Sequence, residues 1–132
     1  MSQKDPPPRK QPRIKAAPRI RELYWCDFPE DAQLPEFWKR RPIIVMSYKN
    51  TLSGAVTVIP CSSLDQPENP WAIKLSTTVD GQGPSWAICD KLTTVAVSRL
   101  SMDKNGKRRL SEDEFNSILS KVLTWLPKLP ES

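Results

Sequence analysis

Histidine is absent from this 132-residue sequence, and cysteine and glycine are scarce, with three and four residues respectively. Without histidine or a Cys-x-x-Cys pair, the chain lacks the usual ligands of a zinc site. None of the glycines has the spacing of a phosphate-binding loop. The apolar runs are far shorter than the roughly 20 residues of a membrane span, and the N-terminus lacks a signal-peptide pattern. We therefore expect a cytoplasmic protein with no metal, no cofactor and no membrane partner.

The three cysteines are Cys26, Cys61 and Cys89. They are odd in number and widely spaced, and each lies within an apolar run. This pattern predicts reduced, buried thiols and not a disulfide framework.

Positive charge is concentrated at the N-terminus. Residues 1–20 hold six of the 20 basic residues and one of the 15 acidic ones, so the rest of the chain, with 14 of each, is neutral. Residues 1–19 also carry five of the 14 prolines and almost nothing to bury. We expect a flexible arm at 1–19 and a folded domain at 20–132. The arm is either a solubilising extension or a source of non-specific affinity for a polyanion.

Short β-like runs separated by turn residues fill the first part of the domain. They predict six strands, at residues 22–28, 42–48, 55–60, 71–75, 85–89 and 92–97. The period then changes, because apolar residues from Phe115 to Leu126 recur at helical spacing. Ser111 and Glu114 form a capping-box pattern, and Pro127 is expected to end the helix. The sequence predicts a mainly β (α+β) fold, a small barrel closed by a C-terminal amphipathic helix.

The segment at residues 101–112 resembles a calcium-binding loop, but its first position is a serine and three cations follow Gly106. We interpret Asn105-Gly106 as a hairpin turn. Of the five tryptophans, Trp25, Trp86 and Trp125 are expected in the core. Trp38 and Trp71, at loop edges, either pack or stack on a nucleobase.

Three consecutive cations, Lys39, Arg40 and Arg41, directly precede a strand that is rich in β-branched residues. Cleavage of RNA without metal or histidine needs a cation for the developing phosphate charge, a base and an acid, while the 2′-OH supplies the nucleophile. The candidates are Arg40 or Arg41, a nearby hydroxyl, and a carboxylate at a strand end such as Asp90. Each candidate could instead have a structural role. The arginine could be a surface cation paired with a carboxylate, the hydroxyl could belong to a turn, and Asp90 could be a structural carboxylate.

The order of motifs ELYWCDF, RRPIIVMS, VTVIPCSS and SWAICDKLTTVAVSRL, followed by a helix, resembles the PemK/MazF family of toxin endoribonucleases. The resemblance covers about residues 21–126. It implies an SH3-like barrel, a homodimer, and metal-independent cleavage of single-stranded RNA to a 2′,3′-cyclic phosphate. It also implies a cognate antitoxin, whose disordered acidic tail occupies the RNA groove.

Carried over by position, the resemblance assigns catalytic roles to Arg41, Ser62 and Asp90. The residues expected to bind RNA surround them in the sequence: Trp38, Lys39, Arg40, Ser63 and Lys91.

Four positions depart from the family pattern. Arg21 and Lys39 stand where the family usually has glycine, Lys91 stands where a glutamine is common, and Ile88 replaces an arginine of one branch. Ile88 and Lys39 motivate the alternative function, a non-catalytic SH3-like module that binds RNA or a protein tail in the same groove.

Overall fold

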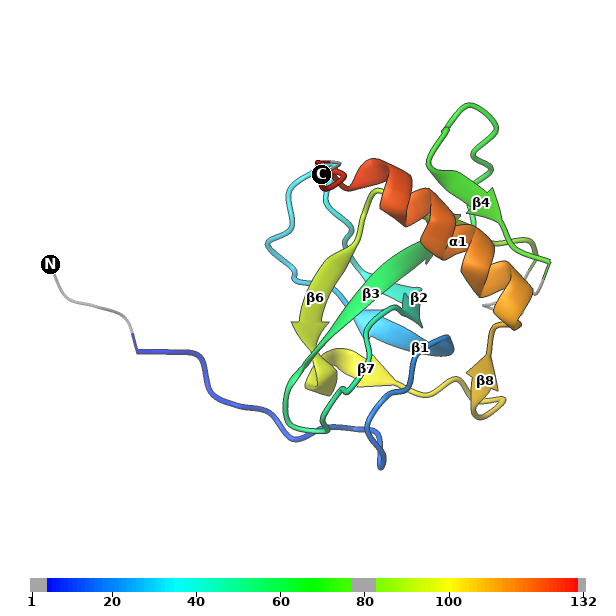
Figure 1. The fold of residues 1–132 in the computed structure, drawn as a ribbon. Coiled ribbons are helices and arrows are strands. Elements are labelled where there is room, and N and C mark those ends of the chain that lie inside the picture. Colours follow the sequence, from blue (N-terminus) through cyan, green and yellow to red (C-terminus); the bar gives the residue numbers. More distant parts are fainter. Residues whose placement is uncertain (1–4, 77–82, 131–132) are drawn as a thin grey trace, which may run out of the picture.

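The computed structural model describes residues 5–76 and 83–130. Eight strands form one curled antiparallel sheet, and a single α-helix follows (Figure 1). The elements are β1 (Glu22–Asp27), β2 (Arg40–Val45), β3 (Ala55–Ser62), β4 (Ala72–Lys74), β5 (Trp86–Ile88), β6 (Thr93–Ala96), the 3-10 turn η1 (Val97–Arg99), β7 (Leu100–Ser101), β8 (Arg108–Arg109) and α1 (Glu112–Trp125). No helix in these described ranges is long and apolar enough to cross a membrane.

The predicted barrel with a C-terminal helix is confirmed, and all six predicted strands are present. The sheet order is β4-β5-β3-β2-β1-β7, with β6 paired to β3 and β8 paired to β1. The two-residue strands β7 and β8 were not predicted, because so short a segment has no period of its own. Pro42 was expected to start its strand, but β2 begins two residues earlier, at Arg40.

Two hydrophobic clusters lie on opposite faces of the sheet. Alternation along β2 separates them, since Ile44 belongs to one cluster while Ile43 and Val45 belong to the other. The first cluster is covered by α1, which contributes Phe115, Ile118 and Val122. In Figure 1 this helix lies across the sheet in front of β3.

Helix α1 begins where the capping pattern predicted. The Ser111 hydroxyl accepts a hydrogen bond from the Glu114 amide at 3.2 Å. The Glu114 carboxylate does not complete the box, because it accepts instead from the amide of Ser76 at 2.6 Å. The helix ends at Trp125, before Pro127. Trp125 was expected in the core, and this was wrong, since it is 43% exposed.

The arm contacts the barrel in its second half. Ile14 is only 5% exposed and belongs to the second cluster. Arg13 forms an ion pair with Asp27 at 2.8 Å, and Arg9 donates to the carbonyl of Ser53 at 2.9 Å. Residues 1–4 of the expected arm lie outside the described residues. The flexibility of the segment remains a prediction.

All three cysteines are buried, as predicted. Burial raises the pKa of the Cys26 thiol to about 12 and that of the Cys89 thiol to about 11, from an ordinary value of 9. Burial also raises the pKa of the Tyr24 hydroxyl, which donates to the buried Glu22 carboxylate at 3.0 Å.

These raised pKa values predict alkaline destabilisation. A raised pKa stabilises the fold fully below the unfolded-state pKa and loses that contribution as pH rises through the folded value. We expect the free energy of unfolding in urea to fall as the pH is raised from about 9 to 11. The double variant Cys26→Ala/Cys89→Ala should show a shallower fall, and an identical slope in the two proteins would contradict this origin.

Candidate active site

A groove of about 860 Å³ runs along β6. Its lining includes Phe28 and Phe37 from the chain after β1, Asp90 from the turn between β5 and β6, and Arg99 of η1. Pro60, near the end of β3, also lines it. The lining therefore combines aromatic and polar side chains around a space large enough for a nucleotide.

Asp90 lines this groove, at the turn between β5 and β6. Its Oδ1 atom is buried and has no hydrogen-bond partner within the described residues. A buried acceptor without a donor costs free energy. Asp90 is therefore suited to accept a proton or a hydrogen bond from a ligand hydroxyl.

Arg41 borders the groove through Phe37. Its guanidinium carbon lies 5.8 Å from the centroid of the Phe37 ring and 6.0 Å from that of Trp38, and its Nε donates to the Trp38 carbonyl at 3.0 Å. No carboxylate forms an ion pair with it in the part of the chain that the structure describes. The interpretation of Arg41 as a paired surface cation thus has no support here.

Ser62 ends β3 and is 6% exposed. Its Oγ accepts a hydrogen bond from the Leu64 amide at 3.1 Å, as a turn hydroxyl would, and this leaves its own proton available for donation. Ile43 on β2 lies opposite Pro60 on β3. This register brings Arg41 and Ser62 to the same end of the two strands.

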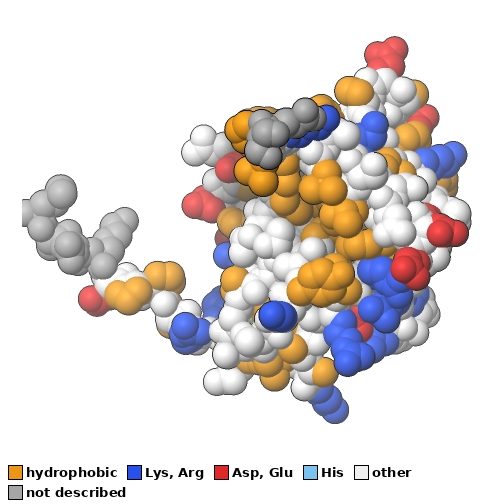
Figure 2. Space-filling model, in the orientation of Figure 1, with side chains coloured by type: hydrophobic (Ala, Val, Ile, Leu, Met, Phe, Trp, Pro, Cys, Tyr) orange, Lys and Arg blue, Asp and Glu red, His pale blue; other side chains and the backbone are white. Residues whose placement is uncertain are grey.

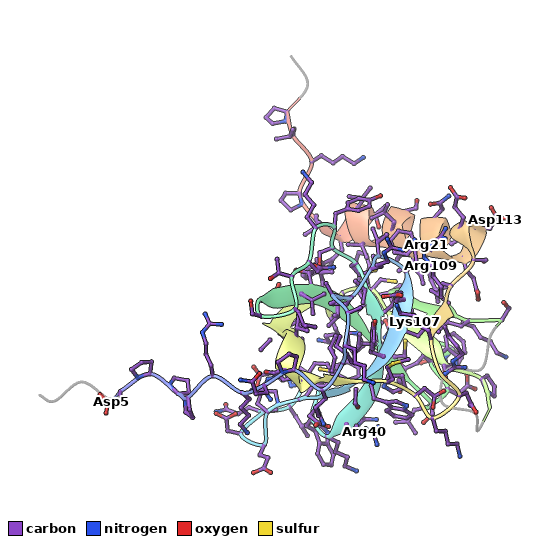
Figure 3. The ribbon with its side chains drawn as sticks, turned by 90° about the horizontal axis from the view of Figure 1, so that it is seen from below. Asp5, Arg21, Arg40, Lys107, Arg109 and Asp113 are labelled. Carbon is purple, nitrogen blue, oxygen red and sulfur yellow. The ribbon has the colours of Figure 1, made fainter. Side chains whose placement is uncertain are left out.

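The residues expected to bind RNA are spread over two sides of β2. Lys39 places its Nζ 4.1 Å from the Trp38 ring centroid, and Trp38 is 43% exposed. Arg40 points the other way, over the Trp25 ring at 4.8 Å, with a hydrogen bond of 3.3 Å to Ser101. Figure 3 shows Arg40 at the opposite end of the barrel from Arg21 and Arg109.

Two more residues were expected to bind RNA. Lys91 lines the groove beside Asp90, whereas Ser63 is exposed just beyond β3. The structure therefore gathers Asp90 and Lys91 in the groove and Arg41 and Trp38 at its edge. Arg40 stays apart from them.

Sequence reasoning missed Arg99 and the aromatic wall. Arg99 lines the groove and donates to the carbonyl of Asp27 at 3.0 Å. It belonged to the segment from Asp90 to Leu100 that carried the family resemblance, which was the available signal. Phe28 and Phe37, whose ring centroids are 6.1 Å apart, were treated only as apolar residues.

The lining of the groove is slightly acidic. Asp31, Glu36 and Asp90 outnumber Lys91 and Arg99. Ile88, where one branch of the family has arginine, is 4% exposed and lies opposite Ala72 on β4. The two basic lining residues are thus outnumbered, and a further cation, Arg41, lies beside Phe37 at the edge of the groove.

Cys89, directly before Asp90, is fully buried. Because burial raises the pKa of its thiol to about 11, the thiol is protonated at neutral pH. It is not a candidate nucleophile.

The fold and this groove define the class of the protein, a small curled β-barrel with one C-terminal helix and a nucleotide-sized site at a sheet edge. The model of the PemK-like, MazF-like toxins of type II toxin-antitoxin systems matches residues 19–126. The chain belongs to this PemK/MazF family.

Solved structures support the fold. MazF of Deinococcus radiodurans (Form-I) is 19% identical with a TM-score of 0.67, covering 83% of this chain and 96% of that one. An endoribonuclease in complex with its cognate antitoxin from a mycobacterial species is 18% identical with a TM-score of 0.62, covering 86% and 100%. The MazE-MazF complex (Form-II) of D. radiodurans is 17% identical with a TM-score of 0.60, covering 83% and 95%. A comparison with curated protein sequences finds no match.

The resemblance places Arg21 and Lys39 where the family usually has glycine, and both residues have a left-handed backbone. The φ angle is +74° at Arg21 and +68° at Lys39. For a residue with a side chain this conformation costs about 1–2 kcal/mol. Main-chain hydrogen bonds hold both conformations. The Arg21 amide donates to the Val45 carbonyl, and the Phe28 amide donates to the Lys39 carbonyl. The loop at Lys39 therefore keeps a glycine-like path without glycine.

Lys39→Gly should raise the free energy of unfolding by about 0.5–1 kcal/mol, because relief of the left-handed strain exceeds the added entropy of the unfolded chain. Urea unfolding measures this. Arg40→Gly is the matched control, since the next residue lies in a regular strand and glycine should cost about 0.5–1 kcal/mol there. A loss of stability in Lys39→Gly as large as that in Arg40→Gly would contradict the strain.

Proposed function

We propose that this protein is a toxin endoribonuclease that cleaves single-stranded RNA without metal and is neutralised by a cognate antitoxin. The observation that carries the proposal is the unpartnered Asp90 oxygen in a groove whose aromatic wall is bordered by Arg41. Family membership supports the same activity. Complexes of similar structures with antitoxins support the partner.

In the proposed reaction Asp90 accepts the proton of the RNA 2′-OH, and the 2′ oxygen attacks the adjacent phosphorus. The bond from phosphorus to the 5′ oxygen breaks, and the leaving oxygen takes up a proton from solvent. The Arg41 guanidinium stabilises the charge that develops on the phosphate oxygens, and the Ser62 hydroxyl donates a hydrogen bond to one of them. The products are a 2′,3′-cyclic phosphate and a 5′-hydroxyl.

Trp38, Phe28 and Phe37 supply surfaces on which bases stack. Lys91 and Lys39 contribute positive charge near the bound strand, and Ser63 is exposed at the end of β3. Arg40, over Trp25, has a lesser part, because it lies on the opposite face of β2 from Arg41.

Arg41→Ala should lower the rate of RNA cleavage in excess EDTA by about 100- to 1,000-fold, the usual cost of losing a donor to developing charge. Asp90→Asn should lower it by about 100- to 10,000-fold through loss of the base. Cleavage of a long RNA with mapping of product ends measures both. Arg40→Ala should lose much less, and the remote Arg109→Ala should match the wild type.

The alternative function is a non-catalytic SH3-like module that binds RNA or a protein tail in the same groove. Ile88 and Lys39 motivate it, and Ile88 is buried, at 4% exposure. It predicts salt-dependent RNA binding by the wild type with the RNA left intact. Cleavage that is lost in Arg41→Ala excludes it. An absence of cleavage by the wild type overturns the endoribonuclease.

We also propose a homodimer. Hydrophobic side chains gather along α1 in Figure 2, where Leu123 and Trp125 are 55% and 43% exposed. Exposed apolar patches of this kind mark protein-binding surfaces.

Light scattering on the purified protein should give twice the chain mass, and Leu123→Glu should shift it toward the monomer. Met102→Glu, at an apolar residue of the β7–β8 turn that is as exposed as Trp125, should leave the dimer intact. A monomeric wild type at high concentration would contradict the proposal.

A further inference from the structure

A second hollow, of about 1050 Å³, lies between the N-terminal arm and the barrel. Residues 6–11 and Arg13 form its outer wall, and residues 52–55 together with β6 and η1 form its inner wall. Thr94, Val95, Ala96 and Arg99 line both this hollow and the groove that contains Asp90. The two spaces therefore adjoin along β6.

The arm is fastened at three points beside this hollow. Ile14 is buried in the second cluster. Arg13 binds the Asp27 carboxylate and also donates to the Arg99 carbonyl at 2.7 Å. Arg9 donates to the Ser53 carbonyl. Figure 1 shows the arm passing along this end of the barrel before it extends away.

The charges of the two spaces differ in sign. The groove around Asp90 has three acidic and two basic lining residues, whereas the second hollow has Arg9, Lys10, Arg13 and Arg99 against Asp27 alone. Within residues 5–76 and 83–130, Arg13 is the one of these cations that pairs with a carboxylate. A strand of RNA that leaves the groove along β6 therefore enters a region of positive potential.

The proline-rich sequence keeps this wall extended. Pro6, Pro7, Pro8 and Pro12 favour a backbone that rises about 3.1 Å per residue, so that cations on it follow a strand and do not collapse onto one point. Because the rest of the chain is neutral, the arm is where the molecule's excess positive charge lies.

We propose that the arm and the β6 edge form a second section of the RNA-binding groove, which binds phosphates that flank the cleaved nucleotide. This inference rests on the proposed endoribonuclease function. It assigns Arg9 and Lys10 as the phosphate-binding residues and Arg13 as the positioning residue that holds the arm against η1.

The test uses an RNA in which the cleavage site has been mapped. The value of kcat/KM is measured on a minimal oligonucleotide around that site and on one extended in both directions, at salt concentrations from 50 to 200 mM. Three full-length proteins are compared: the wild type, Arg9→Gln/Lys10→Gln, and Lys15→Gln/Arg19→Gln. The last variant removes the same charge from the same arm at exposed residues that do not line the hollow.

We expect Arg9→Gln/Lys10→Gln to make cleavage of the extended RNA less salt-dependent. Each phosphate contact of a single strand contributes about 0.7 to the logarithmic slope, so two lost contacts reduce it by about 1.4. Raising the salt from 50 to 200 mM should therefore lower the kcat/KM of this variant on the extended RNA about sevenfold less than that of the wild type. Cleavage of the minimal RNA should be unchanged, and Lys15→Gln/Arg19→Gln should behave as the wild type on both.

Two results would overturn this proposal and leave the proposed endoribonuclease activity intact. One is a wild type with the same kcat/KM and salt dependence on the two RNAs, and the other is equal effects of the two double variants. A wild type that cleaves neither RNA overturns the endoribonuclease and this inference together.

Discussion

The pairing of β2 between β1 and β3 is the constraint on which the rest of the structure depends. This strand is buried on both faces, with Ile43 and Val45 in one cluster and Ile44 in the other. A shift of one residue would exchange the two faces and place every one of these side chains in the wrong cluster. The same register fixes the cations at the start of the strand. It is why Arg41 reaches the aromatic wall of the groove while Arg40 lies over Trp25.

The positions of the charged residues matter more in this molecule than their total. The domain is neutral overall, and the groove that holds Asp90 has more acidic than basic lining residues. An excess of cations next to Asp90 would form an ion pair with its buried Oδ1 atom. Without that excess, Oδ1 remains able to accept a proton from a ligand. Besides the lining residues Lys91 and Arg99, further cations lie at the edges of the groove, with Arg41 beside Phe37 and the arm beside Arg99. In the proposed function this separates proton acceptance from phosphate binding.

Local pattern predicted most of the fold. The period of the β-branched runs gave six strands, and the spacing from Phe115 to Leu126 with Ser111 before it gave the helix. The same pattern predicted a small barrel, and the family resemblance added its SH3-like type and assigned the catalytic roles to Arg41, Ser62 and Asp90. Features that depend on distant partners were not predicted. The two-residue strands β7 and β8 exist only because β1 offers them a free edge, and Ile14 is buried only because the second cluster leaves room for it.

For the candidate site, the types of residue could be predicted, but their placement could not. The types of residue followed from the chemistry, since RNA cleavage without histidine or metal leaves arginine, hydroxyl and carboxylate. Which of two adjacent arginines faces the groove did not follow, because the start of β2 was misplaced by two residues. Arg99 was hidden for another reason. A cation next to a buried strand end is ordinary in sequence, and only the curl of the sheet brings it to the same groove as Asp90.

The two residues that replace family glycines show how a sequence can depart from its family without changing its backbone. Arg21 and Lys39 keep left-handed φ angles although each carries a long side chain. Each residue directly precedes a strand, because β1 begins one residue after Arg21 and β2 begins one residue after Lys39. The strand that follows each residue and a main-chain hydrogen bond at each position fix the path of the chain, so the strain is tolerated. In exchange, a cation lies over Trp38 at the edge of the groove. A glycine cannot supply that charge. The substitution therefore sacrifices a little stability for positive potential at the point where the acidic groove lacks it.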